Sequence, residues 1–134
     1  MNYPNFFSAK ISNNLFGLKK EFDFLHSLYE KKKLPKVLLF TGNKGLGKST
    51  LINHFLFSIF DEKNYDLKLN ILKNSSSFFT QFKNNSFSNI IYIQGSDFKS
   101  IKIDDIRNLK SKIFKSTILD KERFIIFDDI ELFN

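Results

Sequence analysis

The chain contains no cysteine, and this absence excludes disulfide bonds and thiolate metal sites. Histidine is nearly as scarce, and His26 and His54 alone make a poor metal-ligand set. We interpret both as helix-surface or core-edge residues. Long apolar runs are also missing, since none approaches the ~20 residues that cross a bilayer. The N-terminal sequence MNYPNFFSAK lacks the charged start and apolar stretch of a signal peptide, so we expect a cytoplasmic location and no membrane partner.

Glycine and proline are few, at 5 and 2 residues, while hydrophobic residues make up 42% and charged residues 26% of the chain. This composition is typical of soluble globular proteins rather than disordered or fibrous ones. A length of 134 residues suits one domain or part of one. We therefore treat residues 1–134 as a single domain or a piece of a single domain.

The formal net charge of +7 is open to two interpretations. Basic residues release counterions from a phosphate backbone, so the excess is consistent with a nucleic-acid surface. However, only Arg107 and Arg123 are arginine, and the lysines accompany many Asn, Ile and Phe residues. An AT-rich coding sequence would produce the same bias. Charge alone therefore does not identify a DNA-binding patch.

Apolar spacing predicts the first elements of the fold. A three- and four-residue repeat over residues 18–29, with charged residues between, predicts an amphipathic helix. Pro35 follows it, and the unbroken apolar run at residues 37–40 then predicts a strand buried on both faces. The glycines of residues 42–47 end that strand, and helical spacing returns from Lys48 to about Phe60. The order is strand, glycine-rich loop, helix.

The second half of the chain continues the alternation of strands and helices. Residues 61–88 are polar, rich in Asn and Ser and without a steady period, so we expect an insertion or long loop there. Residues 90–93 and 124–127 predict two further strands, and residues 103–113 predict a helix that Asp104 or Asp105 caps. The pattern predicts an α/β fold with a parallel sheet. Because no element follows to close the sheet before Asn134, we expect a truncated protein.

The strongest motif is GNKGLGKS at residues 42–49, which fits G-x-x-x-x-G-K-[ST] and lies between a predicted strand and a predicted helix. Glycines let successive N–H groups turn towards phosphate oxygens, and a helix N-terminus adds partial positive charge. A glycine-rich turn capped by Ser49 is the structural alternative. Lys48 is expected to reach the β- and γ-phosphates of ATP, and Ser49 to ligate Mg²⁺. The expected nucleotide-binding residues are Gly42, Asn43, Lys44, Gly45, Leu46, Gly47, Lys48, Ser49 and Thr50.

A second motif, FIIFDD at residues 124–129, has the form of a Walker B strand, in which an apolar strand ends in an acidic residue. Asp128 is expected to orient the water shell of the Mg²⁺, and Asp129 stands where an ATPase places its catalytic base. Alone, such a sequence is also a common strand end and turn. Asp129 is one methylene shorter than the usual Glu, and a misplacement of ~1 Å can cost ~100-fold in rate. ATP binding is therefore better supported than hydrolysis.

Four runs together resemble a known family: LPKVLLFTGNKGLGKSTLINHF, NIIYIQ, IKIDDIRNLKSKI and RFIIFDDIELFN. They look like the N-terminal AAA+ module of bacterial clamp-loader subunits of the DNA polymerase III holoenzyme, and the likeness covers Leu15 to Asn134. The I-x-I-D-x-I-R pattern marks the delta-prime and gamma/tau group. Gamma/tau members typically carry Asp-Glu-Val-His after the last strand, whereas residues 128–134 look like the delta-prime version. The fold class expected is thus a P-loop NTPase (AAA+) three-layer fold.

The resemblance has implications and two departures. Lys36 stands where members often have His, and residues 61–88 hold no cysteine where many relatives carry a four-cysteine zinc module, so zinc is not expected. The resemblance implies a stator that works with gamma/tau, delta, the sliding clamp and primed DNA. It places the arginine finger, sensors, lid and collar beyond Asn134. Arg107 and Arg123 do not match the finger and are interpreted as surface residues.

Two functions remain open from the sequence. The first is an assembly subunit, a clamp-loader stator that binds ATP but contributes mainly interfaces. The second is an active P-loop ATPase of another AAA+ branch, driving remodelling by hydrolysis. The pair Asp128 and Asp129 favours the first.

Overall fold

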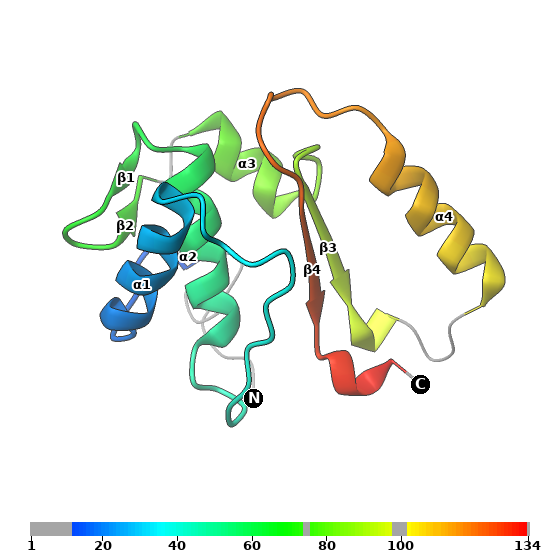
Figure 1. The fold of residues 1–134 in the computed structure, drawn as a ribbon, viewed down its shortest axis with the longest axis horizontal. Helices are drawn as coiled ribbons and strands as arrows, with labels where there is room; N and C mark the ends of the chain where they lie inside the picture. Colours follow the sequence, from blue (N-terminus) through cyan, green and yellow to red (C-terminus); the bar gives the residue numbers. More distant parts are fainter. Residues whose placement is uncertain (1–11, 74–75, 98–101, 134) are drawn as a thin grey trace. The chain divides into compact units, whose positions relative to one another are not determined.

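The computed structural model describes residues 12–73, 76–97 and 102–133 (Figure 1). The chain divides into two compact units, Met1–Thr80 and Gln81–Asn134, and each is described here by itself. The elements confirm the α/β class with a small parallel sheet. No helix among the described residues is long and apolar enough to cross a membrane.

The first unit is built on α1 (Lys19–Glu30) and α2 (Lys48–Phe60), and both helices were predicted from apolar spacing. Tyr29 of α1 meets Phe55 of α2 edge to face, with ring centroids 6.0 Å apart. Elsewhere on α2, Phe57 makes edge contacts with Phe78 and Phe79. Each such buried side chain contributes about 1.5–3 kcal/mol of hydrophobic stabilisation, so α2 is the core helix of this unit.

Of the two predictions for residues 61–88, an insertion or a long loop, the structure contradicts the long irregular loop. Two short strands, β1 (Tyr65–Asp66) and β2 (Ile71–Leu72), pair antiparallel, with Tyr65 opposite Leu72. They are followed by α3 (Ser77–Lys83), which spans the boundary between the units. The apolar residues of α3 are buried despite the polar composition around them. Phe78, Phe79 and Phe82 are therefore core residues.

His54 lies in the centre of the first unit, which corrects its interpretation as a surface or core-edge residue. Its exposed fraction is 0%. Nε2 lies 3.1 Å from the carbonyl oxygen of Ser12, which is only an acceptor, so Nε2 carries the ring proton. Nδ1 then accepts a hydrogen bond from the Tyr65 hydroxyl at 2.9 Å. Burial lowers the pKa of His54 from 6.5 to about 4, against the opposing effect of the Ser12 bond, and burial also raises the pKa of Tyr65.

The second unit contains β3 (Ile90–Gln94) and β4 (Phe124–Asp128), which pair parallel with Ile90 opposite Phe124. Asn89, fully buried, fixes the approach to β4, because its amide donates to the carbonyl oxygens of Leu119 and Lys121. Short 3-10 turns follow each strand, η2 (Gly95–Asp97) and η3 (Ile130–Leu132). Both strands thus end in the same direction.

The helix between these strands, α4 (Ile103–Phe114), confirms the predicted element, and Asp105 caps its start as one of the two predicted candidates. The helix starts after Lys102, and the Asp105 carboxylate accepts the backbone N–H of Lys102 at 2.9 Å. At the other end, Arg123 donates to carbonyl oxygens of the last turn, including that of Lys112 at 3.2 Å. Arg123 therefore closes α4 and is more than a surface residue, whereas Arg107 makes an exposed ion pair with Asp104.

The strand predicted at residues 37–40 does not form. Val37 and Leu39 expose 86% and 72% of their surface, and no backbone hydrogen bond joins residues 37–40 to another described residue. An apolar run becomes a strand only where a neighbour supplies ladder hydrogen bonds. The parallel sheet of the described chain therefore has two strands rather than the three predicted.

Candidate functional site

The glycine-rich loop leads directly into α2, as the motif requires. Gly45 and Gly47 have φ of +87° and +83°, a left-handed conformation that is unfavourable for any residue with a Cβ. Gly47 is the N-cap residue of α2, and its carbonyl accepts the N–H of Leu51 at 2.9 Å. The glycines therefore allow the loop to turn sharply into the helix, which a chain with side chains at these positions would resist.

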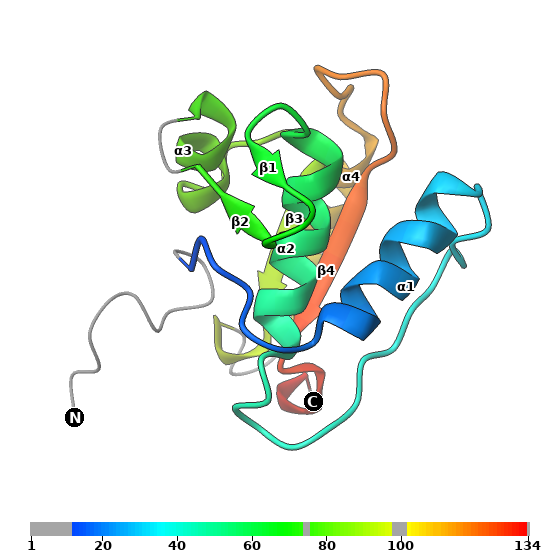
Figure 2. The same ribbon diagram turned by 90° about the vertical axis from the view of Figure 1, so that its left-hand side faces the viewer.

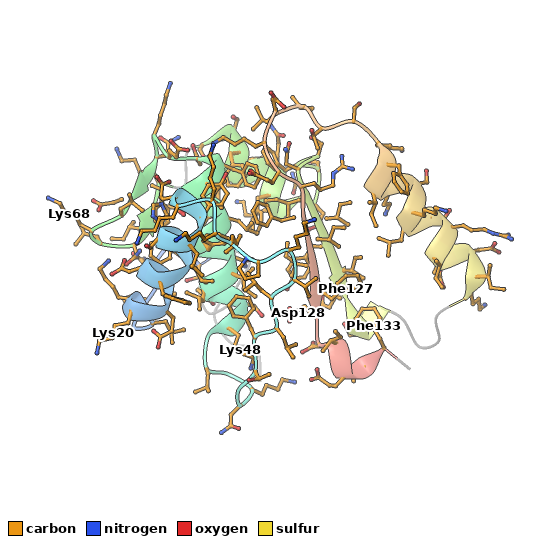
Figure 3. All side chains as sticks on the ribbon, in the orientation of Figure 1. Lys20, Lys48, Lys68, Phe127, Asp128 and Phe133 are labelled. Carbon is orange, nitrogen blue, oxygen red and sulfur yellow. The ribbon has the colours of Figure 1, made fainter. Side chains whose placement is uncertain are left out.

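The backbone of the loop holds the charged side chain of Lys48 in place. Its ammonium donates to the carbonyl oxygens of Gly42 at 2.7 Å and Asn43 at 2.9 Å. The loop backbone thus curls around the side chain, and Figure 3 shows Lys48 at the start of α2. A phosphate oxygen can replace these two carbonyl oxygens as the partner of the ammonium, because it is a stronger acceptor for an ammonium than a neutral carbonyl.

The start of α2 supplies the other features of an anion site. The first turn of an α-helix carries backbone N–H groups that the helix itself does not pair. They point outward from the helix start, where the dipole adds about half a positive charge. Residues 42–46 are exposed, and the first turn is half-buried. The loop therefore fits a phosphate chain in its residue types, its backbone conformation and its accessibility.

Asp128 ends β4 and its carboxylate is fixed from two sides. The Tyr92 hydroxyl on β3 donates to Oδ2, and the backbone N–H of Asp129 donates to Oδ1 at 3.1 Å. Asp128 lies opposite Gln94 in the parallel ladder, so Tyr92 reaches it diagonally from the same face. A carboxylate held in one orientation is a suitable outer ligand for the water shell of Mg²⁺.

Asp129 differs from Asp128 in conformation and contacts. Its φ and ψ are both 50°, in the left-handed region, and its carbonyl accepts the N–H of Leu132 at 2.9 Å. A Cβ added at Gly95 would overlap this same carbonyl oxygen. The backbone of Asp129 is therefore packed against the end of β3.

The structure places the predicted site residues in two groups. Those of the P-loop, from Gly42 to Thr50, belong to the first unit, and Asp128 and Asp129 belong to the second. Among residues 12–73, 76–97 and 102–133, no three His, Asp or Glu side chains gather as a metal site. The two expected Mg²⁺ ligands, Ser49 and Asp128, thus lie in different units.

Sequence reasoning missed Tyr92 and Gly95. Tyr92 contacts Asp128 because of the register in which β3 pairs with β4, and a single sequence does not reveal that register. Gly95 carried a usable signal, since a glycine directly after a predicted strand often marks a close approach of two backbones. Here the approaching backbone is that of Asp129.

Comparison with known protein families identifies a match. Residues 17–134 match the family model described as DNA polymerase III, delta subunit, a clamp-loader family. No curated protein and no solved structure matches the chain significantly.

Proposed function

The chain belongs to the DNA polymerase III delta subunit family, and we propose that it is a clamp-loader subunit of the delta-prime type that binds Mg·ATP during DNA replication. The family supports a role in a clamp loader. The delta-prime assignment is the finer step, and it is supported by the I-x-I-D-x-I-R pattern and by the sequence that follows β4. Within that assignment the chain is an AAA+ module.

The observation that carries the ATP-binding proposal is the curl of the loop around Lys48. Two carbonyl contacts hold the ammonium at the loop, beside glycines in left-handed conformations and the exposed first turn of α2. Lys48 and the N–H groups of the first turn would hold the phosphates, and the Ser49 hydroxyl would bind the Mg²⁺. Bound Mg²⁺ would neutralise charge on the β- and γ-phosphates.

Hydrolysis by this chain is not part of the proposal. Asp129 has the shorter side chain and a backbone fixed by Leu132 and Gly95. Positioning a water for attack needs a base within ~3 Å of it. We therefore propose a subunit whose nucleotide site serves assembly, with gamma/tau, delta, the sliding clamp and primed DNA as its partners.

A reconstitution tests the assembly role. The natural protein is combined with the other clamp-loader subunits of its genome, and loading of the sliding clamp onto primed circular DNA is measured. Loading is expected to require this subunit, and the variant Lys48→Ala is expected to change the nucleotide dependence of complex formation. Full loading in the absence of the subunit would contradict the proposal.

A further inference from the structure

A run of lysines follows α1 at residues 31–36, KKKLPK, and we call this segment the lysine turn. Its basic side chains are all exposed: Lys31, Lys32, Lys33 and Lys36. In Figures 1 and 2 the end of α1 lies at the top and the start of α2 at the bottom. The lysine turn is therefore at the opposite end of this helix pair from the P-loop, and the nucleotide site does not account for it.

The backbone of the lysine turn is held in one conformation. The N–H of Lys33 donates to the carbonyl of Leu28 at 2.8 Å, and the N–H of Lys32 donates to that of Tyr29 at 2.9 Å. These two bonds make a Schellman motif, in which the residue at the position of Lys32 is usually glycine. Lys32 has a φ of 55°. A lysine thus stands where glycine would fit with less strain.

Helix stability alone does not explain these lysines. Cations near a helix C-terminus interact favourably with its dipole, but the effect falls off within the last turn. Lys33 and Lys36 lie beyond that turn, and the strained conformation of Lys32 opposes the gain that its charge brings. Backbone strain at an exposed charged residue such as Lys32 supports a functional hypothesis, because the strain brings no evident gain in stability.

The charges of the lysine turn are also not neutralised by neighbours. The ion pairs Lys19–Asp23 and Arg107–Asp104 lie outside this segment, and among the described residues no ion pair is found at Lys31, Lys32, Lys33 or Lys36. Glu30 is the one carboxylate in residues 30–36, which leaves a net local excess of positive charge. A fixed, exposed excess of this kind attracts a polyanion.

We propose that the lysine turn binds the sugar-phosphate backbone of duplex DNA without reading base sequence. An ammonium is a compact point charge that contacts single phosphate oxygens, whereas base recognition favours the two-pronged contacts of Arg, Asn or Gln. Clustered lysines on a rigid turn therefore suit the phosphate backbone. The choice of duplex DNA over another polyanion rests on the replication role proposed above.

The test compares two triple variants of equal charge. One is Lys31→Ala, Lys32→Ala and Lys33→Ala in the lysine turn. The control is Lys63→Ala, Lys68→Ala and Lys73→Ala, three exposed lysines elsewhere in the first unit. Fluorescence anisotropy with a labelled DNA duplex gives affinity across a salt series. Each lost phosphate contact lowers the slope of log affinity against log salt by about 0.9, so the first variant should lose about 2 to 3 in slope and at least about tenfold in affinity. The control should keep the parental slope to within about 1.

A single substitution separates binding from folding. Lys32→Gly relieves the left-handed strain, so thermal unfolding should occur at the same or a higher temperature, while the salt slope falls by about 1. Equal losses in both triple variants would overturn the proposal, because net charge would then explain binding. Binding to anionic lipid vesicles in place of the duplex would also overturn it.

A nucleotide titration keeps this inference distinct from the proposed function. Parent and lysine-turn variant should bind Mg·ATP equally, because the lysine turn is remote from the P-loop. If neither binds nucleotide while DNA binding is lost only in the lysine-turn variant, the ATP proposal fails and this inference stands.

Discussion

The Tyr92 hydroxyl on β3 donates a hydrogen bond to Oδ2 of Asp128 at the end of β4. The two residues come from neighbouring parallel strands and face the same side of the sheet. Oδ1 of Asp128 is taken by the backbone N–H of Asp129. Tyr92 is therefore a positioning residue for the carboxylate that we expect beside Mg²⁺.

Tyr92→Phe removes that hydroxyl and keeps the ring. A hydrogen bond to a charged group contributes about 1.5 kcal/mol or more, so Mg·ATP affinity should fall by about tenfold. Affinity for ATP in the presence of a chelator should not change, and Asp128→Asn should reproduce the loss. If Mg²⁺ enhances ATP binding in Tyr92→Phe as much as in the parent, Tyr92 has no positioning role.

Gly95→Ala should disturb the acidic pair by a purely steric route. The added methyl would overlap the Asp129 carbonyl oxygen and press on Leu132, and overpacking of this kind costs about 1–3 kcal/mol. Chemical denaturation should show that loss, whereas Ser96→Ala, at the exposed next residue, should stay close to the parent. Equal stability of both variants would contradict this prediction, because it would mean that the turn after β4 shifts to accept the added methyl group at little cost.

His54 predicts a dependence of stability on pH. The unfolded histidine binds a proton below its pKa of 6.5, but burial delays protonation in the folded chain to a pKa of about 4. Between these values the unfolded state binds more protons, so the free energy of unfolding falls as pH falls. The window of about 2.5 pH units corresponds to about 3 kcal/mol.

Urea denaturation between pH 7 and pH 4 measures this dependence. Carboxylates titrate in the same range, so the informative quantity is the difference between parent and variant. His54→Gln should flatten the curve, because it removes the group whose pKa differs between the folded and unfolded chain. A curve that keeps its full slope in His54→Gln would contradict the buried neutral imidazole.

The elements that could be predicted from the sequence are those whose apolar residues form a regular local pattern. α1, α2 and α4 show a repeated apolar spacing, and β3 and β4 are short apolar runs that find each other as partners. Residues 37–40 have the same apolar character but no partner strand among the described residues. A run of four apolar residues indicates that the segment can be buried or can pair as a strand. Whether it pairs depends on whether another segment of the chain supplies a neighbouring strand.

The remaining features depend on tertiary contacts that one sequence does not display. α3 is short, and the Asn and Ser residues that surround it in the sequence do not indicate that its Phe residues are buried. The burial of His54 depends on Tyr65 and on the Ser12 carbonyl, residues distant along the chain. Within the site, the motif predicted Lys48 and Asp128, whereas Tyr92 follows only from strand register.

Turnover of ATP by this chain alone should be negligible. An arginine finger is commonly worth about 10³ to 10⁵ in rate, and the described arginines are occupied elsewhere, Arg107 with Asp104 and Arg123 with the end of α4. Asp129→Glu separates the causes, since phosphate release should rise only if the short side chain is the limiting defect. Rapid hydrolysis by the unmutated chain that disappears in Lys48→Ala would favour the independent ATPase.

Calorimetric titration of Mg·ATP into the chain, compared with Lys48→Ala and Lys44→Ala, tests the central claim most directly. Both variants remove one lysine from the same loop, but only Lys48 is held by the loop carbonyls of Gly42 and Asn43. We predict that the parent binds Mg·ATP, that Lys48→Ala weakens binding by about 100-fold, as expected for a charge-assisted bond of about 3 kcal/mol, and that Lys44→Ala stays within about threefold of the parent. Equal affinity of the parent and Lys48→Ala would contradict the P-loop assignment.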